Sequence, residues 1–175
     1  MNNRGFTLVE LVIGIVVLAI AMMVMNTMLI SQSKDALEPL YRLRASQLGQ
    51  SIMQNVLARA YDENSDHNGG LYRCGEVWPS TGTTQDCSTV LGRDTGEVEG
   101  EHQDYNDVDD FITSGFEPAV NYGDALGNDL PSQYNNYQIK IDVVEVVANS
   151  RKKISVTINT PSNEDIRFSA LKGNY

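Results

Sequence analysis

The chain has 175 residues, with 13 lysines and arginines against 23 aspartates and glutamates, and a formal net charge of −10 at pH 7. This acidic balance excludes a general nucleic-acid binder, which needs a basic surface, and the 41% of hydrophobic residues excludes a disordered chain. The length is that of one domain, or of one domain with an appendage.

The first predicted element is an apolar helix that crosses a membrane, over residues 6–30. Its first twenty residues contain only two polar side chains, Thr7 and Glu10, and a helix of that length rises about 30 Å, the thickness of a bilayer's hydrocarbon core. The preceding residues, MNNRG, carry one positive charge, Arg4. Because positively charged flanks stay in the cytoplasm, we expect the N-terminus inside and everything after Asn26 outside.

Glu10 distinguishes this helix from simpler apolar segments. The run is longer than the roughly 7–15 apolar residues of a cleaved secretory signal. A plain single-span anchor fits the length but does not explain the acid, because a carboxylate inside hydrocarbon costs about 2.5–3.5 kcal/mol and marks a functional site. Glu10 therefore needs a positive partner, supplied by the chain's own end or by another subunit.

Residues 4–10 read RGFTLVE and lead into the apolar run. This combination resembles the class III signal of type IV pilins and pseudopilins. The resemblance implies that a prepilin peptidase removes residues 1–5 by cutting after Gly5, and that the new N-terminal residue, Phe6, is N-methylated. It also implies that Glu10 pairs with the charged N-terminus of a neighbouring subunit. The expected partners are other pilin subunits, the prepilin peptidase and an inner-membrane assembly platform.

An amphipathic helix is predicted over residues 31–61, continuous with the membrane helix. Its apolar residues recur at intervals of three and four and form one stripe, which we expect to pack on a sheet because no clean heptad persists for a coiled coil. Pro39 should kink the helix, and Gly49 is a second weak point. The stripe comprises Leu37, Leu40, Tyr41, Ala45, Leu48, Ile52, Val56, Leu57 and Ala60.

An acidic region without sustained periodicity follows, over residues 62–133. Its residues 62–129 hold sixteen acids and only two bases, Arg73 and Arg93. They are also rich in Gly, Ser, Thr and Asn, so we predict a long ordered loop region with short elements.

The only cysteines are Cys74 and Cys87, and both lie outside the membrane in the predicted topology. An even number of cysteines in an oxidising compartment favours a disulfide between them. Two alternatives are disfavoured. A zinc site with His67 and His102 lacks compact ligand spacing, and a nucleophilic cysteine lacks a motif that would orient a base.

Oxygen-bearing side chains are concentrated in the run DYNDVDD within the acidic region. Calcium prefers carboxylate and amide oxygens, so the run is a candidate calcium site. The other interpretations are a solvated acidic loop, or carboxylates that cap a helix near Phe111. The candidate ligands are Asp104, Asp107, Asp109 and Asp110.

Four fragments of the outer region carry a narrower resemblance. They are Tyr61–Glu63, Cys74–Gly75, Cys87 and Asp107–Phe111. Together they resemble the MshD-type minor pilins of the mannose-sensitive haemagglutinin (MSHA) pilus system of Gram-negative bacteria. This resemblance implies a minor pilin that initiates, modulates or decorates a pilus for surface attachment.

An antiparallel sheet of three strands is predicted over residues 134–175. Apolar and polar residues alternate in each strand, and the alternation slips at 144–147, which indicates a bulge. Short turns favour a meander with one apolar face. The basic run at 151–153 is expected to be an exposed turn, with docking to an acidic face of another subunit as the alternative. The strands centre on residues 137–143, 154–158 and 166–170.

These elements predict an α+β architecture, the pilin fold, in which the apolar face of the sheet and the helix stripe cover one another. We expect a non-enzymatic minor pilin with no catalytic residues and no required cofactor. It would be held in the inner membrane, with its C-terminal domain in the periplasm, and then displayed on a cell-surface pilus. The alternative functions are a pseudopilin of a type II secretion system and a calcium-dependent ligand-binding tip module or adhesin.

Overall fold

The computed structural model describes residues 7–66, 72–98, 100–123, 128 and 130–175. The chain divides into two compact units, Met1–Leu40 and Tyr41–Tyr175. Helix α1, Leu8–Leu57, contributes to both units, and it continues through Pro39, the site of the expected kink.

The N-terminal part of α1 carries mostly apolar side chains. Its segment Leu8–Met28 is long and apolar enough to cross a membrane, with a mean hydropathy of 2.8 and none of its residues buried within the chain. Ile13 and Leu18, for example, are 58% and 56% exposed. Because side chains this apolar are unfavourable in water, the segment requires lipid or other protein around it.

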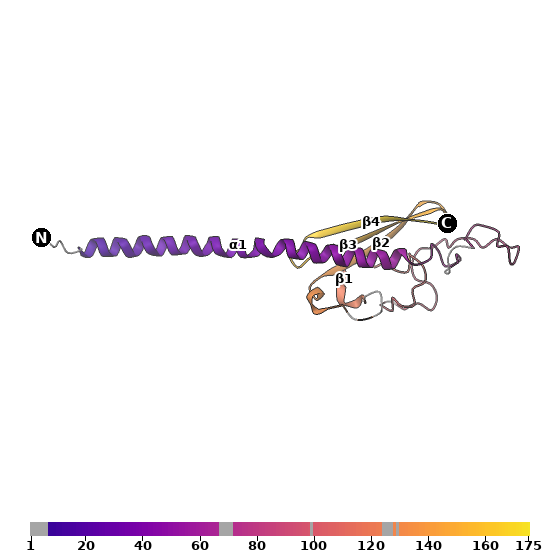
Figure 1. Cartoon of the computed structure of the whole chain (residues 1–175), viewed down its shortest axis with the longest axis horizontal. Helices are drawn as coiled ribbons and strands as arrows, with labels where there is room; N and C mark the ends of the chain where they lie inside the picture. The colour runs from indigo at the N-terminus through magenta and orange to yellow at the C-terminus, as the bar shows by residue number, and fades with distance from the viewer. Residues whose placement is uncertain (1–6, 67–71, 99, 124–127, 129) are drawn as a thin grey trace. The chain divides into compact units, whose positions relative to one another are not determined.

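The second unit contains a four-stranded antiparallel sheet with the strand order β1-β2-β3-β4 (Figure 1). The three long strands confirm the predicted meander, and the short first strand was not expected. Two 3₁₀ helices, η1 and η2, lie between β1 and β2 along the chain. The bounds are β1 Glu117–Pro118, η1 Ala119–Asn121, η2 Ser132–Tyr134, β2 Gln138–Val147, β3 Arg151–Asn159 and β4 Asp165–Gly173.

Alternation of apolar residues determines which face of β2 and β3 is buried. Ile141 pairs with Val156 in the register of these two strands, and both are completely buried. The register shifts between Glu145 and Val147, which confirms the predicted bulge. The turn after β2 contains Asn149, whose φ of 55° lies in the left-handed region that asparagine tolerates better than most residues.

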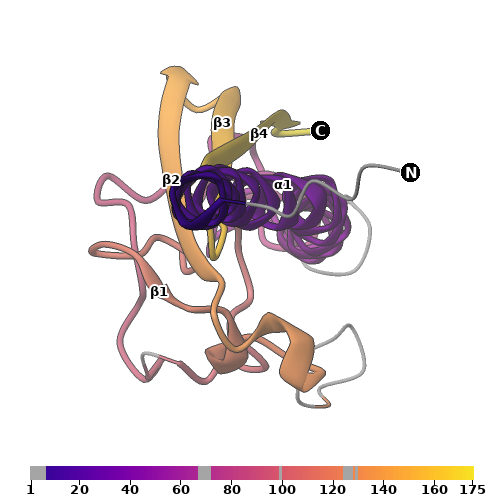
Figure 2. The ribbon, with the colours of Figure 1, turned by 90° about the vertical axis from the view of Figure 1, so that its left-hand side faces the viewer.

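The sheet packs against the C-terminal turns of α1, as both views show (Figures 1 and 2). Gly49 has a specific role in this packing, because a Cβ atom there would lie 2.3 Å from Cε2 of Phe168 in β4. The predicted weak point is therefore a site of close helix–sheet approach. The buried contact combines Ala45, Leu48, Ile52 and Val56 of α1 with Ile139, Ile141, Val143, Ile154, Val156 and Ile158 of the sheet.

Two local features differ from the expectations. Helix α1 ends at Leu57 rather than near residue 61, because the backbone N–H of Ala60 donates to the carbonyl of Asn106 and the chain there pairs with the acidic region. A helix near Phe111, one of the three interpretations of the run DYNDVDD, is likewise not found among the described residues, which form turns at this point. These turns place the aspartates described below.

Candidate functional site

The N-terminus of α1 presents Glu10 in the first helical turn. The hydroxyl oxygen of Thr7 accepts a hydrogen bond from the backbone N–H of Glu10 at 3.3 Å, which caps the helix just before its apolar segment. Glu10 is exposed and surrounded by exposed apolar side chains. The sequence contains no lysine, arginine or histidine between Arg4 and Lys34, so the apolar segment itself supplies no cation.

The predicted processing residues, Gly5 and Phe6, lie outside the described residues. Cleavage, methylation and the role of Glu10 in assembly therefore stay predictions at the level of single residues. The described helix begins at Leu8, two residues after Phe6 in the sequence, and Thr7 is its capping residue.

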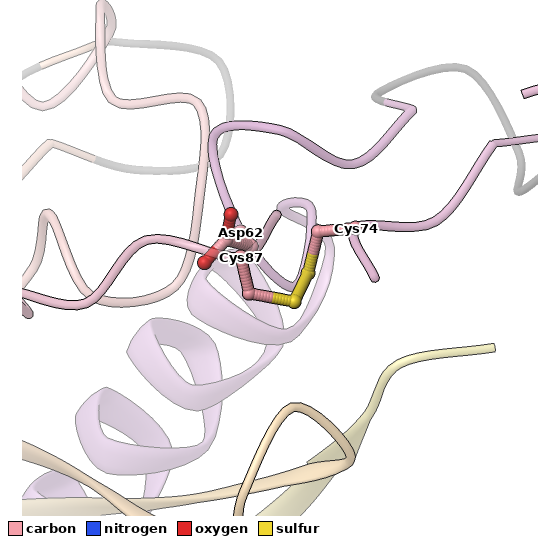
Figure 3. A group of neighbouring side chains, drawn as sticks. All are labelled: Asp62, Cys74 and Cys87. Carbon is pink, nitrogen blue, oxygen red and sulfur yellow. A yellow bond between two sulfur atoms is a disulfide. The ribbon is translucent and has the colours of Figure 1, made fainter. Parts of the chain in front are cut away.

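The disulfide predicted from the sequence is present in the second unit. Cys74 and Cys87 are bonded, with their Cα atoms 4.7 Å apart, and both are buried beside Tyr61. Figure 3 shows the carboxylate of Asp62 next to this bond. That carboxylate accepts hydrogen bonds from the backbone N–H of Ser88 at 3.0 and 3.2 Å. The disulfide and Asp62 together anchor the acidic region just beyond the end of α1.

Lys152 is the central charge of this region, and its side chain is buried in β3. Its Nζ donates to the carbonyl of Tyr61 at 2.7 Å and to Oδ2 of Asp62 at 3.5 Å, and it forms an ion pair with Asp109. A buried ammonium is tolerated only when such partners replace water. The expectation that residues 151–153 form an exposed turn is wrong, because all three lie in β3 and Lys152 is only 1% exposed.

Asp107 and Asp110 close a turn through their own carboxylates. Oδ1 of Asp107 accepts from the backbone N–H groups of Asp109 and Asp110 at 2.8 and 3.3 Å. Oδ2 of Asp110 accepts from the N–H groups of Asn106 and Asp107, both at 2.9 Å. Both side chains are 1% exposed. Short polar side chains that bond nearby backbone groups compete with helix formation, which explains the turn here.

Burial perturbs the proton equilibria of these carboxyls. It raises the pKa of Asp107 to about 8, with the neighbouring charges of Asp109 and Asp110 adding to the effect. It raises the pKa of Asp110 to about 7 against the opposing effect of the N–H donors, and the Glu97 carboxyl adds to the increase. Slight burial of the otherwise exposed Asp94, with the charges of Glu63 and Glu97 nearby, also raises the pKa of its carboxyl.

The four candidate calcium ligands do not occupy one place. Asp107 and Asp110 lie together, and each offers an oxygen close to one from Asp94. Asp109 instead pairs with Lys152, and Asp104 is exposed. Calcium binding stays a prediction.

The disfavoured zinc alternative has lost its sulfur ligands, because the two cysteines form a disulfide. His102 lies among aromatic rings, with its centroid 4.1 Å from that of Tyr122, and burial lowers its pKa. The other histidine of this alternative, His67, lies outside the described residues.

The comparison with known protein families gives a match at the N-terminus only. Residues 1–26 match the family model described as the prokaryotic N-terminal methylation motif. The chain carries a prepilin signal. This prepilin signal supports a type IV pilin or pseudopilin, anchored in a membrane by its apolar helix, and points to a structural subunit rather than an enzyme. It implies processing by a prepilin peptidase and assembly with other pilins.

The fold agrees with the prepilin signal. The long N-terminal helix, the C-terminal antiparallel sheet and the Cys74–Cys87 disulfide fit the pilin α+β fold. No curated protein and no solved structure matches the chain.

The buried role of Lys152 was missed, although the sequence contains a signal for it. In a strand, residues two apart share a face, so Lys152 shares the face of Ile154, Val156 and Ile158. Extending the predicted strand two residues backward would have placed this lysine in the core. The identity of its partners has no comparable signal, because Asp62 precedes Lys152 by 90 residues.

Proposed function

We propose that this chain is a minor type IV pilin of the MSHA type, which enters a surface-attachment pilus or initiates its assembly. The observation that carries the proposal is the prepilin signal placed directly before an exposed apolar helix with one acid in its first turn. Such a helix has no stable place in water, and it suits a subunit that moves from the membrane into a filament of similar helices.

The four fragments that resemble MshD-type pilins support the assignment to the MSHA type. Asp62 of the first fragment binds the N–H of the residue after Cys87, and Cys87 is bonded to Cys74. Lys152 links Asp62 to Asp109 of the last fragment. Fragments that are far apart in the sequence thus build one buried network, so their joint occurrence in the sequence has a structural reason.

Replacing Gly5 by valine is expected to block processing. The side chain would occupy space that glycine leaves free next to the scissile bond, and we expect cleavage to slow by at least about tenfold. The measurement is N-terminal sequencing and intact mass of the full chain after co-expression with a prepilin peptidase. The wild-type protein should begin at a methylated Phe6.

Gly14→Val is the matched control, because a Cβ atom at position 14 would have no neighbouring atom within 4 Å and the residue lies beyond the cleavage site. It should be processed like the wild type. A mature wild-type protein that begins at Met1 would overturn the proposed processing.

A deletion strain separates the MSHA assignment from the pseudopilin alternative. Loss of the gene should reduce mannose-sensitive haemagglutination and the number of MSHA pili, while secretion of type II substrates stays unchanged. Complementation with the full chain should restore both properties, and complementation with Gly5→Val should not. The reverse pattern, with secretion lost and haemagglutination retained, would instead establish a pseudopilin of a type II system.

A further inference from the structure

Three acidic side chains outside the Lys152 network meet at one point of the acidic region. Asp94, Asp107 and Asp110 each offer a carboxylate oxygen, and these oxygens lie within 4.8 Å of one another. Asp107 and Asp110 are buried, whereas Asp94 is exposed. The point is therefore open to solvent on the side of Asp94 and lined by protein on the side of the turn.

One buried oxygen of this group lacks a hydrogen-bond donor. Oδ2 of Asp110 accepts two backbone N–H groups, but its Oδ1 is buried and has no hydrogen-bond partner among the described residues. The carboxyl of Glu97 lies beside that of Asp110, and its Oε1 is also buried without a hydrogen-bond partner among the described residues. An ionised carboxylate only accepts hydrogen bonds, so these two neighbouring carboxyl oxygens cost free energy unless a shared proton or a bound cation lies between them.

The buried cation of the region is already engaged. An ammonium group has three hydrogens, and Lys152 directs its own at Tyr61, Asp62 and Asp109. Arg93, in the same loop as Asp94, donates from Nη1 to the carbonyl of Ile112. Acids outnumber bases sixteen to two in residues 62–129, so an ion from solution can supply further positive charge to this region.

We propose that Asp94, Asp107 and Asp110 form a calcium-binding site, with Glu97 beside it. The ligands are all carboxylate oxygens, which favours a hard cation over zinc or copper. Two oxygens on one calcium ion lie up to about 5 Å apart, given calcium–oxygen distances of about 2.3–2.6 Å, whereas magnesium limits them to about 4.2 Å. The three oxygens, which lie within 4.8 Å of one another, are close enough together to bind one calcium ion.

This ligand set differs from the one predicted from the sequence. Asp109 is removed from it because it neutralises Lys152, and Asp104 is removed because it is exposed and lies outside the group. Asp94 is added, although ten or more residues separate it from the other ligands. A bound ion would join the loop around residue 94 to the turn at 107–110 and hold two segments of the acidic region together.

The test uses the full chain purified in detergent and stripped of metal with EDTA. Calcium titration by calorimetry should give one site per chain with a dissociation constant of about 10⁻⁵–10⁻³ M. The thermal midpoint should rise by at least about 2 °C in 5 mM CaCl₂ and return when EDTA is added. Sodium chloride of equal ionic strength should not reproduce the increase.

Variants locate the ion. Asp94→Asn changes an exposed side chain and should fold normally, yet it should weaken calcium binding by about tenfold or more. Asp110→Asn should do the same where it folds. Asp104→Asn removes another exposed acid from the same region and should leave the affinity unchanged.

Three results would overturn the proposal. The first is no calcium heat and no thermal shift in the wild type at 5 mM. The second is an affinity that Asp94→Asn leaves unchanged. The third is an equal thermal shift from magnesium or sodium salts, which would indicate general screening of the acidic region in place of a calcium site.

Discussion

Glu10→Leu is expected to insert into the membrane normally and to fail to enter filaments. Removing a carboxylate from hydrocarbon lowers the insertion cost by about 2.5–3.5 kcal/mol, so the variant should accumulate at least as well as the wild type. Assembly should fall by about 10²–10³-fold, because an ion pair at 4 Å contributes roughly 4 kcal/mol at an effective dielectric constant near 20. The measurement is the ratio of this subunit in sheared pili to that in membranes.

The matched control is Glu101→Leu, the same replacement at an exposed acid in the second unit, which should assemble normally. Glu10→Gln keeps the shape of the side chain but removes its charge, and this variant should also fail to enter filaments. Normal filament content of Glu10→Leu would show that the acid has no part in recruitment, and the apolar helix would then be a plain anchor.

Lys152→Met is expected to destabilise the second unit by about 3–5 kcal/mol. The substitution keeps most of the side-chain volume but leaves the buried carboxylates of Asp62 and Asp109 without their cation. The cost comes from those stranded charges rather than from a cavity. Urea unfolding of the full chain in detergent, followed by near-ultraviolet circular dichroism, measures the change.

The control for Lys152→Met is Lys153→Met, which makes the same change of charge at the next residue of β3. Lys153 is exposed, so its replacement should change the free energy of unfolding by no more than about 0.5 kcal/mol. Adding Asp109→Leu to Lys152→Met should recover part of the loss, because one stranded charge is then removed. Equal effects at positions 152 and 153 would contradict a structural role for the buried pair.

Most of the fold could be predicted from local patterns in the sequence. The apolar run of α1 and the two-residue alternation of β2 and β3 depend on which neighbouring residues share a face, so they are legible without a structure. The same holds for the bulge between Glu145 and Val147, which appears as a slip in the alternation. Boundaries were less accurate, because the end of α1 depends on the pairing of Ala60 with the distant Asn106.

Some candidate site residues could likewise be recognised from the sequence, and others could not. Glu10 is notable in the sequence alone, because an acid inside twenty apolar residues is unfavourable wherever the rest of the chain folds. The sixteen acids of the middle region have no such distinguishing context. Their sequence neighbours are alike, and nothing local separates a buried aspartate from a solvated one.

The sequence by itself determined the membrane helix with its prepilin signal, the cysteine pair and the strands of the sheet. Only the tertiary structure decided that Asp109 neutralises Lys152, that Asp94 meets Asp107 and Asp110, and that Gly49 makes room for Phe168. The reason is the range of the interactions. Periodicity and local charge act over a few residues, whereas these contacts join segments that are brought together only when the chain folds.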